Sequence, residues 1–135
     1  MTSNVDFAQL AEKLVGHDYA YLITVGDDGR PHPVPVMPVL RGDTIYIGAI
    51  GGSRSRKNLA RSNDVTVMWP PPAPGGYTII ADGQADVSEP GGDSLASLKY
   101  VPTRAVLIRV ATPESPGETA CYSDCMDLKL SPQGV

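Results

Sequence analysis

Several residue types are scarce in this sequence, and each shortage excludes a class of protein. Only 2 cysteines occur among 135 residues, too few for a scaffold held together by disulfides. The 11 basic residues are outnumbered by 15 acidic ones, whereas sequence-independent binding of nucleic acid needs a basic surface. No apolar run approaches the roughly 18 residues that span a membrane as a helix. We therefore expect neither nucleic acid nor a membrane among the partners.

The first residues and the few thiols bear on the compartment. Residues 1–7 lack the basic-then-apolar order of a secretory signal peptide. A low cysteine content suits a reducing environment. We expect a cytoplasmic protein, and 135 residues suit a single core.

Glycine and proline, by contrast, are abundant. The 14 glycines and 13 prolines form about a fifth of the chain, against roughly 12% in average proteins. Turns therefore interrupt the chain often, which disfavours long helices and helical bundles. A hydrophobic fraction of 41% still suffices for a core, so the chain is expected to fold.

Periodicity predicts short strands and small helices. Apolar residues at positions 7, 10, 11 and 14 lie on one face of a short helix, which Ser3 or Asn4 can cap. A second short helix is expected over 54–61 and one helical turn over 94–99. Stretches of β-branched and aromatic residues between turn formers predict six strands, over 19–25, 31–40, 44–50, 65–69, 77–87 and 103–111. Six short strands favour a closed or nearly closed antiparallel barrel.

The strand expected over 31–40 is unusual because proline stands at positions 31, 33, 35 and 38. Proline has no N–H group, so prolines spaced by two cannot donate hydrogen bonds along one edge. We expect this strand to be exposed or only half paired.

The chain divides into three parts on this interpretation: an N-terminal helix in 1–18, the barrel in 19–112 and a tail in 113–135. The tail shows no sustained period and carries Cys121 and Cys125. Their thiols could share a helix face, ligate a metal with help from elsewhere, or pair on oxidation; alternatively they are two ordinary thiols. Structural zinc needs four ligands, and only His17 and His32 could complete the set, so we expect no metal site.

The segment 51–57, Gly-Gly-Ser-Arg-Ser-Arg-Lys, is the clearest candidate for a binding site. Its glycines permit a tight turn, and the helix that follows begins with unpaired N–H groups at the positive end of its dipole. Two serine hydroxyls and three cationic side chains add donors that suit phosphate. The pattern indicates an anion site; the alternative is a solvated helix start with scattered basic residues.

Five segments together resemble the pyridoxamine 5′-phosphate oxidase-like flavin-binding split barrels: 19–25, 26–30, 31–40, 53–59 and 65–69. The resemblance covers about two thirds of the chain, 19–110, and is most specific where Gly-Ser-Arg is followed by a short basic helix with Asn58 and Leu59. It implies a mainly β, six-stranded antiparallel split barrel with short flanking helices. It also implies a homodimer with two equivalent sites, each built from both chains.

The same resemblance implies where a cofactor phosphate would be held. Ser53 and Arg54 match the Ser-Arg pair of the family, with Ser55, Arg56 and Lys57 as neighbours. The expected cofactor is FMN, or alternatively coenzyme F420, because the basic run before Asn-Leu is similar to the deazaflavin-using branch.

The second strand would run beside the flavin ring in such a protein. Val34, Val36 and Met37 are therefore candidates for ring contacts, or else ordinary barrel residues. His32 could supply a proton there or simply be exposed. Trp69 could stack on a planar cofactor, cover a dimer seam or pack in the core.

The sequence departs from the oxidases proper, which carry a basic residue at each end of the apolar run that here spans 35–39, and a lysine where Ser55 stands. The expected function is therefore broader: a flavin- or deazaflavin-dependent oxidoreductase acting on a small organic substrate. One alternative is a non-catalytic carrier or sensor of a flavin, a deazaflavin or haem. Another is a dimeric interaction protein with a vestigial site, although a lost site has no need for concentrated positive charge.

Overall fold

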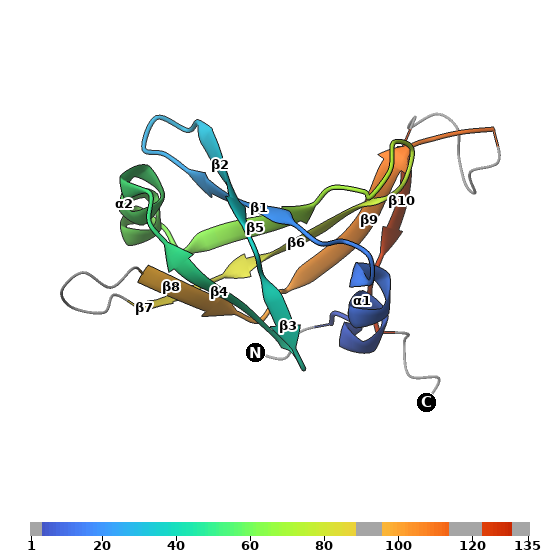
Figure 1. The fold of residues 1–135 in the computed structure, drawn as a ribbon, viewed down its shortest axis with the longest axis horizontal. Coiled ribbons are helices and arrows are strands. Elements are labelled where there is room, and N and C mark those ends of the chain that lie inside the picture. The colour runs from blue at the N-terminus through green and yellow to red at the C-terminus, as the bar shows by residue number, and fades with distance from the viewer. Residues whose placement is uncertain (1–3, 89–95, 114–122, 131–135) are drawn as a thin grey trace.

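Ten strands in two antiparallel sheets dominate the computed structural model, which describes residues 4–88, 96–113 and 123–130 (Figure 1). Neighbouring strands of the larger sheet follow the order β10 (Ser123–Asp127), β9 (Arg104–Val110), β6 (Thr78–Gln84), β5 (Asp64–Trp69), β1 (Ala20–Val25) and β2 (Pro31–Val36). The smaller sheet has the order β3 (Val39–Arg41), β4 (Thr44–Ile50), β8 (Ala96–Tyr100) and β7 (Asp86–Ser88). The mainly β, antiparallel split-barrel class is confirmed, with two open sheets in place of one closed barrel.

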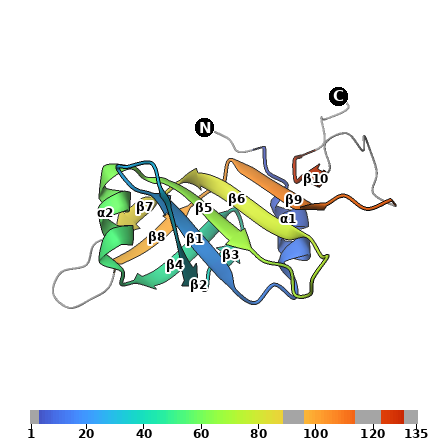
Figure 2. The same ribbon diagram turned by 90° about the horizontal axis from the view of Figure 1, so that it is seen from above.

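Two helices accompany the sheets, α1 (Phe7–Leu14) and α2 (Ser53–Arg61), and they lie at opposite ends of the molecule in both views (Figures 1 and 2). Both were predicted. The cap of α1 differs from the prediction, because Asp6 caps it in place of Ser3 or Asn4: its Oδ1 accepts a hydrogen bond from the Gln9 N–H at 3.0 Å.

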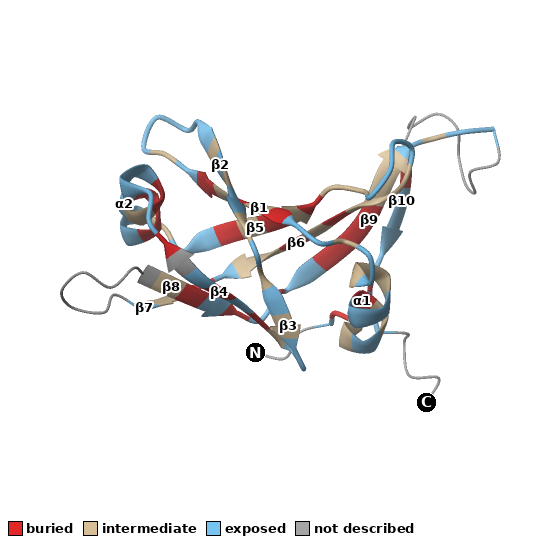
Figure 3. Ribbon diagram, in the orientation of Figure 1, coloured by how far each residue is buried: buried red, intermediate tan, exposed pale blue. Residues whose placement is uncertain are grey.

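The core lies between the sheets and is built by alternation along the strands. Successive strand residues point to opposite faces, so Leu22, Val67 and Ile79 are fully buried while their neighbours are half-buried or exposed. Figure 3 shows this as red segments along β5, β8 and β9, whereas α2 is largely exposed. Trp69, at the end of β5, is 3% exposed and belongs to this core.

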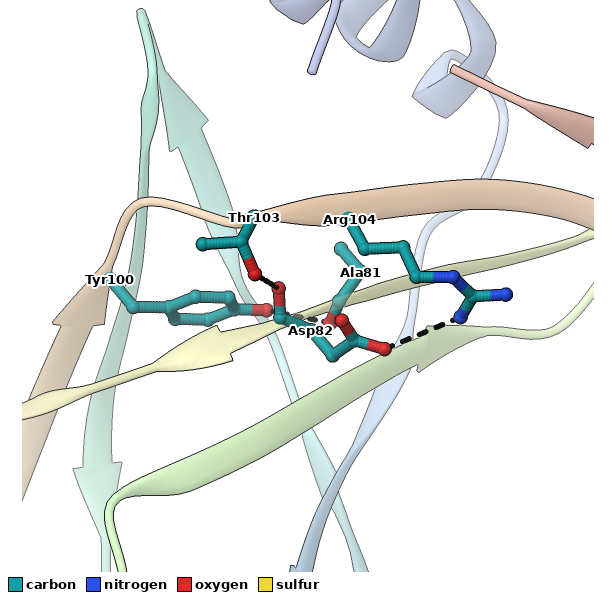
Figure 4. A network of polar contacts seen from close by, with 5 residues as sticks. All are labelled: Ala81, Asp82, Tyr100, Thr103 and Arg104. Atoms are coloured by element: carbon teal, nitrogen blue, oxygen red, sulfur yellow. Dashed lines mark hydrogen bonds and ion pairs between the residues drawn. The ribbon is translucent and has the colours of Figure 1, made fainter. Parts of the chain in front are cut away.

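Tyr100 ties the two sheets together (Figure 4). Its hydroxyl donates a 3.1 Å hydrogen bond to the Ala81 carbonyl of β6, although Tyr100 itself belongs to β8. A Cβ at Gly83 would lie 3.0 Å from the tyrosine ring, so glycine is required for this close approach. Burial, with a contribution from the Asp82 carboxylate, raises the pKa of Tyr100 well above its ordinary value, which keeps the hydroxyl a neutral donor.

Two predicted strands are each divided between the sheets. The segment 31–40 breaks at Met37 and Pro38 into β2 and β3, and 77–87 breaks at Ala85 into β6 and β7. At the second break the Ala85 N–H donates to the Asn63 carbonyl, outside the ladder. A propensity pattern does not show such changes of sheet, because the chain stays extended through them.

The helical turn predicted over 94–99 is wrong for its described part, where Ala96–Tyr100 forms β8. Leu98 and Tyr100 are buried and Lys99 is exposed, which is the period of a strand. The tail also contains a strand that was not predicted, β10, which pairs with β9. Cys125 lies on it as an exposed free thiol, and Cys121 lies outside the described residues.

The prediction for the proline-rich strand is confirmed. β2 is an edge of the larger sheet, and β1 is its only neighbour there among the described residues. Pro31, Pro33 and Pro35 are exposed and alternate with half-buried residues that keep their N–H groups for β1.

A buried carboxylate holds β10 in place. Asp124, 3% exposed, accepts a 2.7 Å hydrogen bond from the Tyr77 hydroxyl and a 2.8 Å hydrogen bond from Arg109 Nε. The Arg109 guanidinium also lies 4.3 Å from the centre of the Tyr77 ring. The hydrogen bond to Asp124 raises the pKa of Tyr77, and burial adds to the shift.

Candidate functional site

A cavity of about 680 Å³ opens where the β1–β2 hairpin meets α2. Four basic side chains line it against two carboxylates, so its formal charge is positive in a protein of net charge −4. The lining residues are Gly26, Asp27, Asp28, Arg30, Pro31, His32, Ser53, Arg54, Lys57, Asn58 and Arg61.

The hairpin wall of the cavity is shaped by its own turn. The Gly26 N–H donates to the Arg30 carbonyl at 2.9 Å, and Gly29 adopts a positive φ of 80° that favours glycine. Asp28 accepts from the Arg30 N–H at 3.0 Å and lies 3.6 Å from its guanidinium Nε. The Asp28 carboxylate is therefore already engaged by Arg30, and this arginine is partly neutralised.

The side of the cavity formed by α2 carries two cations, Arg54 and Lys57, that are not neutralised in the way Arg30 is. Arg54 and Lys57 are three residues apart, so they share a face of α2, and both line the cavity. In the described part of the chain neither forms an ion pair with a carboxylate. Two exposed positive charges therefore face this cavity, and no carboxylate of the described residues is paired with them.

The N-terminus of α2 is uncapped by any side chain. Gly52 is its N-cap, and the first N–H with a partner inside the helix is that of Arg56, which donates to the Gly52 carbonyl at 3.1 Å. The N–H groups of residues 53–55 precede it and have no partner within the helix. These groups and the helix dipole favour an anion beside Arg54.

The structure brings together some of the predicted site residues. Four of them line the cavity described above: His32, Ser53, Arg54 and Lys57. Arg56 lines a separate hollow with Ser53, Lys57 and Ala60. Ser55 is fully buried, and its Oγ has no hydrogen-bond partner in the described chain.

The remaining candidates lie elsewhere. Val34 and Val36 are half-buried against the core, and Met37 follows β2 with 79% of its surface exposed. Trp69 is in the core. None of these four is among the residues that line the cavity.

Sequence reasoning missed Asn58 and Arg61 as site residues. Positions 54, 57, 58 and 61 follow the spacing i, i+3, i+4 and i+7, which marks one face of a helix. That spacing could have identified all four. Arg30 could not have been found in this way, because the hairpin meets α2 only through the tertiary fold.

Two contacts attach α2 to β1 beside the cavity. Asn58 Nδ2 donates a 3.0 Å hydrogen bond to Thr24 Oγ1, and the two residues are 7% and 1% exposed. Arg61 donates from its guanidinium to the Val25 carbonyl at the end of the same strand. The helix face that presents Arg54 and Lys57 is thus attached directly to the hairpin strand.

The donor set of the cavity suits an anionic ligand. No group of three or more His, Cys, Asp or Glu side chains that could hold a metal ion occurs in 4–88, 96–113 or 123–130. No helix of these segments is long and apolar enough to cross a membrane.

Comparison with known proteins places the chain among mycobacterial relatives. It is 44% identical over 133 residues to the uncharacterized protein Mb0449c of Mycobacterium bovis, covering 90% of this chain and 93% of the relative. The uncharacterized protein MT0457 of Mycobacterium tuberculosis gives the same values. The chain belongs to the family of these two proteins. No family model matches the sequence.

Solved structures of similar fold were found for this chain. A protein from Clostridium acetobutylicum of the pyridoxinephosphate oxidase family is 11% identical, with a TM-score of 0.60 over 75% of this chain and 87% of that one. The FAD-binding protein of Mycobacterium smegmatis is 15% identical, with a TM-score of 0.56 over 73% and 88%. An FAD-binding protein of Mesorhizobium loti is 12% identical, with a TM-score of 0.57 over 73% and 89%. The chain therefore has the pyridoxamine 5′-phosphate oxidase-like split-barrel fold, as the sequence resemblance predicted.

Proposed function

We propose that this protein is an oxidoreductase that uses FMN or coenzyme F420 to transfer a hydride to or from a small organic substrate. The observation that carries the proposal is the cavity in which Arg54, Lys57 and the uncapped start of α2 converge, with neither cation paired to a carboxylate of the described residues. Two solved proteins of the same fold are described as FAD-binding, which supports a flavin-type ligand.

The residues at the cavity fit the phosphate of such a cofactor. Arg54 can donate two parallel hydrogen bonds to phosphate oxygens, and Lys57 supplies a compact positive charge. The Ser53 hydroxyl and the first N–H groups of α2 add neutral donors. The hydride chemistry would be supplied by the bound cofactor, and the chain would bind and orient it.

His32 is the candidate for proton exchange at the same cavity. It is half-buried on β2, between Pro31 and Pro33, and an imidazole can donate or accept a proton near neutral pH. Its place in the wall would bring it close to a ligand whose phosphate lies at α2.

A non-catalytic carrier or sensor of a flavin, a deazaflavin or haem is the second candidate function. A shortage of acids for proton transfer favours it. Asp28 is engaged by Arg30, and Asp27 is the other carboxylate that lines the cavity. A carrier would bind the cofactor as tightly as an enzyme and show no turnover with any electron acceptor.

The proposed cofactor can be tested directly on the purified protein. We expect a visible spectrum of a flavin or deazaflavin, and release of the intact phosphate-bearing cofactor on denaturation, identified by mass. Bound haem would favour the carrier. A colourless protein that takes up neither FMN nor F420 in a titration would contradict the proposal.

We also propose a homodimer formed through the outer face of the larger sheet. Tyr21, Met68 and Ile80 lie in register on adjacent strands and point away from the core, and Pro35 extends the row on β2. Such a row, with three half-buried side chains and the exposed Pro35, suits burial against a second copy, and a chain of this size gains much from added burial.

Placing a charge in this row is expected to separate the protomers. Met68→Lys would bury an unpaired ammonium in the interface, so sedimentation at micromolar concentration should show monomers in place of dimers. Ala73→Lys adds the same charge in an exposed loop and should leave the dimer intact. A wild type that is monomeric and still binds cofactor would rule out the dimer.

A further inference from the structure

A buried, hydrogen-bonded polar pair lies beside the cavity. Asn58, on α2, and Thr24, on β1, are joined by a 3.0 Å hydrogen bond between Nδ2 and Oγ1. Asn58 is 7% exposed and lines the cavity, and Thr24 is 1% exposed and does not. Either polar group would be costly to bury without the other, because a buried polar group needs a hydrogen-bond partner.

We propose that the Asn58–Thr24 hydrogen bond positions the anion site by fixing the helix face of Arg54 and Lys57 against β1. This inference rests on the proposed function, because it concerns how the same cavity holds a cofactor phosphate. Asn58 and Thr24 are positioning residues on this account, since they act through the cations and the helix start.

The geometry of α2 explains why a fixed point is needed. Apolar packing between α2 and the sheets involves few side chains, because Leu59 is the buried hydrophobic residue of this helix. Apolar contacts are non-directional and leave a short helix free to rotate or slide slightly. A hydrogen bond has a preferred distance and angle. It therefore restrains both the rotation of α2 about its axis and the position of α2 along β1.

The position of Asn58 makes this restraint effective. Asn58 follows Lys57 directly and lies four residues after Arg54, one helical turn further along the same face. Arg61, one further turn along this face, donates to the Val25 carbonyl next to Thr24. The two anchors thus attach consecutive turns of α2 to consecutive residues of β1 and leave its first turn to face the ligand.

The test compares affinities for FMN and riboflavin, which share a ring and differ in the phosphate. Thr24→Val keeps the shape of a buried side chain that does not line the cavity and removes the acceptor. We expect it to lower the FMN-to-riboflavin affinity ratio about five- to tenfold with riboflavin affinity unchanged. Thr24→Ser keeps the hydroxyl and should retain the wild-type ratio.

A double variant separates positioning from simple stability. Thr24→Val leaves the Asn58 amide buried without a partner, so it should lower the melting temperature, whereas Thr24→Val with Asn58→Leu removes both polar groups and should regain most of that loss. On our proposal the affinity ratio stays low in the double variant although stability returns. Recovery of the ratio together with the melting temperature would overturn the positioning role.

The two proposals can fail separately. If the wild type prefers FMN to riboflavin and Thr24→Val preserves that preference, the positioning role is wrong and the phosphate site stands. If the wild type binds neither FMN nor F420, the proposed function fails and the positioning inference fails with it. The double variant Arg54→Ala with Thr24→Val should bind FMN only slightly more weakly than Arg54→Ala alone. The reason is that both substitutions weaken the same contact with the phosphate.

Discussion

Replacing Arg54 by alanine is expected to weaken FMN binding ten- to a hundredfold. The side chain lines the cavity at the start of α2 and forms no ion pair with a carboxylate in the described chain, so its charge is available to a phosphate. A charge-assisted hydrogen bond of this kind contributes roughly 1.5–3 kcal/mol. At about 1.4 kcal/mol per tenfold change in affinity, its loss gives the stated range.

Riboflavin and a neighbouring arginine provide the controls. Riboflavin lacks the phosphate, so its affinity should be the same for the wild type and Arg54→Ala. Arg56 lines a different hollow, and Arg56→Ala should therefore reduce FMN affinity less than Arg54→Ala does. Titration of both ligands by fluorescence quenching measures all the values. Equal affinities throughout would mean that the start of α2 is only a basic surface turn.

Removing the buried Asp124 carboxylate is expected to destabilise the fold by about 3 kcal/mol. Asp124→Ala would leave the Tyr77 hydroxyl and the Arg109 side chain without the acceptor that they now share. For a domain of this size, such a loss lowers the melting temperature by roughly 10 °C. Thermal unfolding followed by circular dichroism measures it.

The same strand offers a matched comparison for this substitution. Asp127 is also on β10, but it is exposed and its ion pair with Lys129, at 3.4 Å, is exposed as well. Exposed pairs contribute little, so Asp127→Ala should change the free energy of unfolding by less than about 1 kcal/mol. Similar losses for the two variants would show that Asp124 is not the anchor of β10.

The helix of the candidate site could be predicted from the sequence because its signals are local. The Gly-Gly turn, the basic residues and the apolar Leu59 lie within nine positions, and the predicted helix over 54–61 differs from α2 by one residue. The cavity itself could not be predicted in full. Its second wall is formed by residues 26–32 of the β1–β2 hairpin, which lie more than twenty residues before the start of α2.

The missed strands share a physical cause. β10 has one buried side chain in its described part, the polar Asp124, and it forms because Tyr77 and Arg109 supply partners from distant elements. β8 is short and carries the polar residues Ser97 and Lys99 next to its buried Leu98 and Tyr100, so its local pattern is weak. Both strands form by pairing with strands that were predicted. Such pairing is set by the tertiary fold, so the local sequence does not reveal it.

The alternate prolines of β2 also limit how molecules of this protein can associate. A free sheet edge is a template for another strand only when it offers N–H donors as well as carbonyl acceptors. On the outer edge of β2 the prolines supply carbonyls alone, so a second chain cannot extend the sheet there in a regular ladder. At this border the prolines therefore protect the protein against growth of an intermolecular sheet.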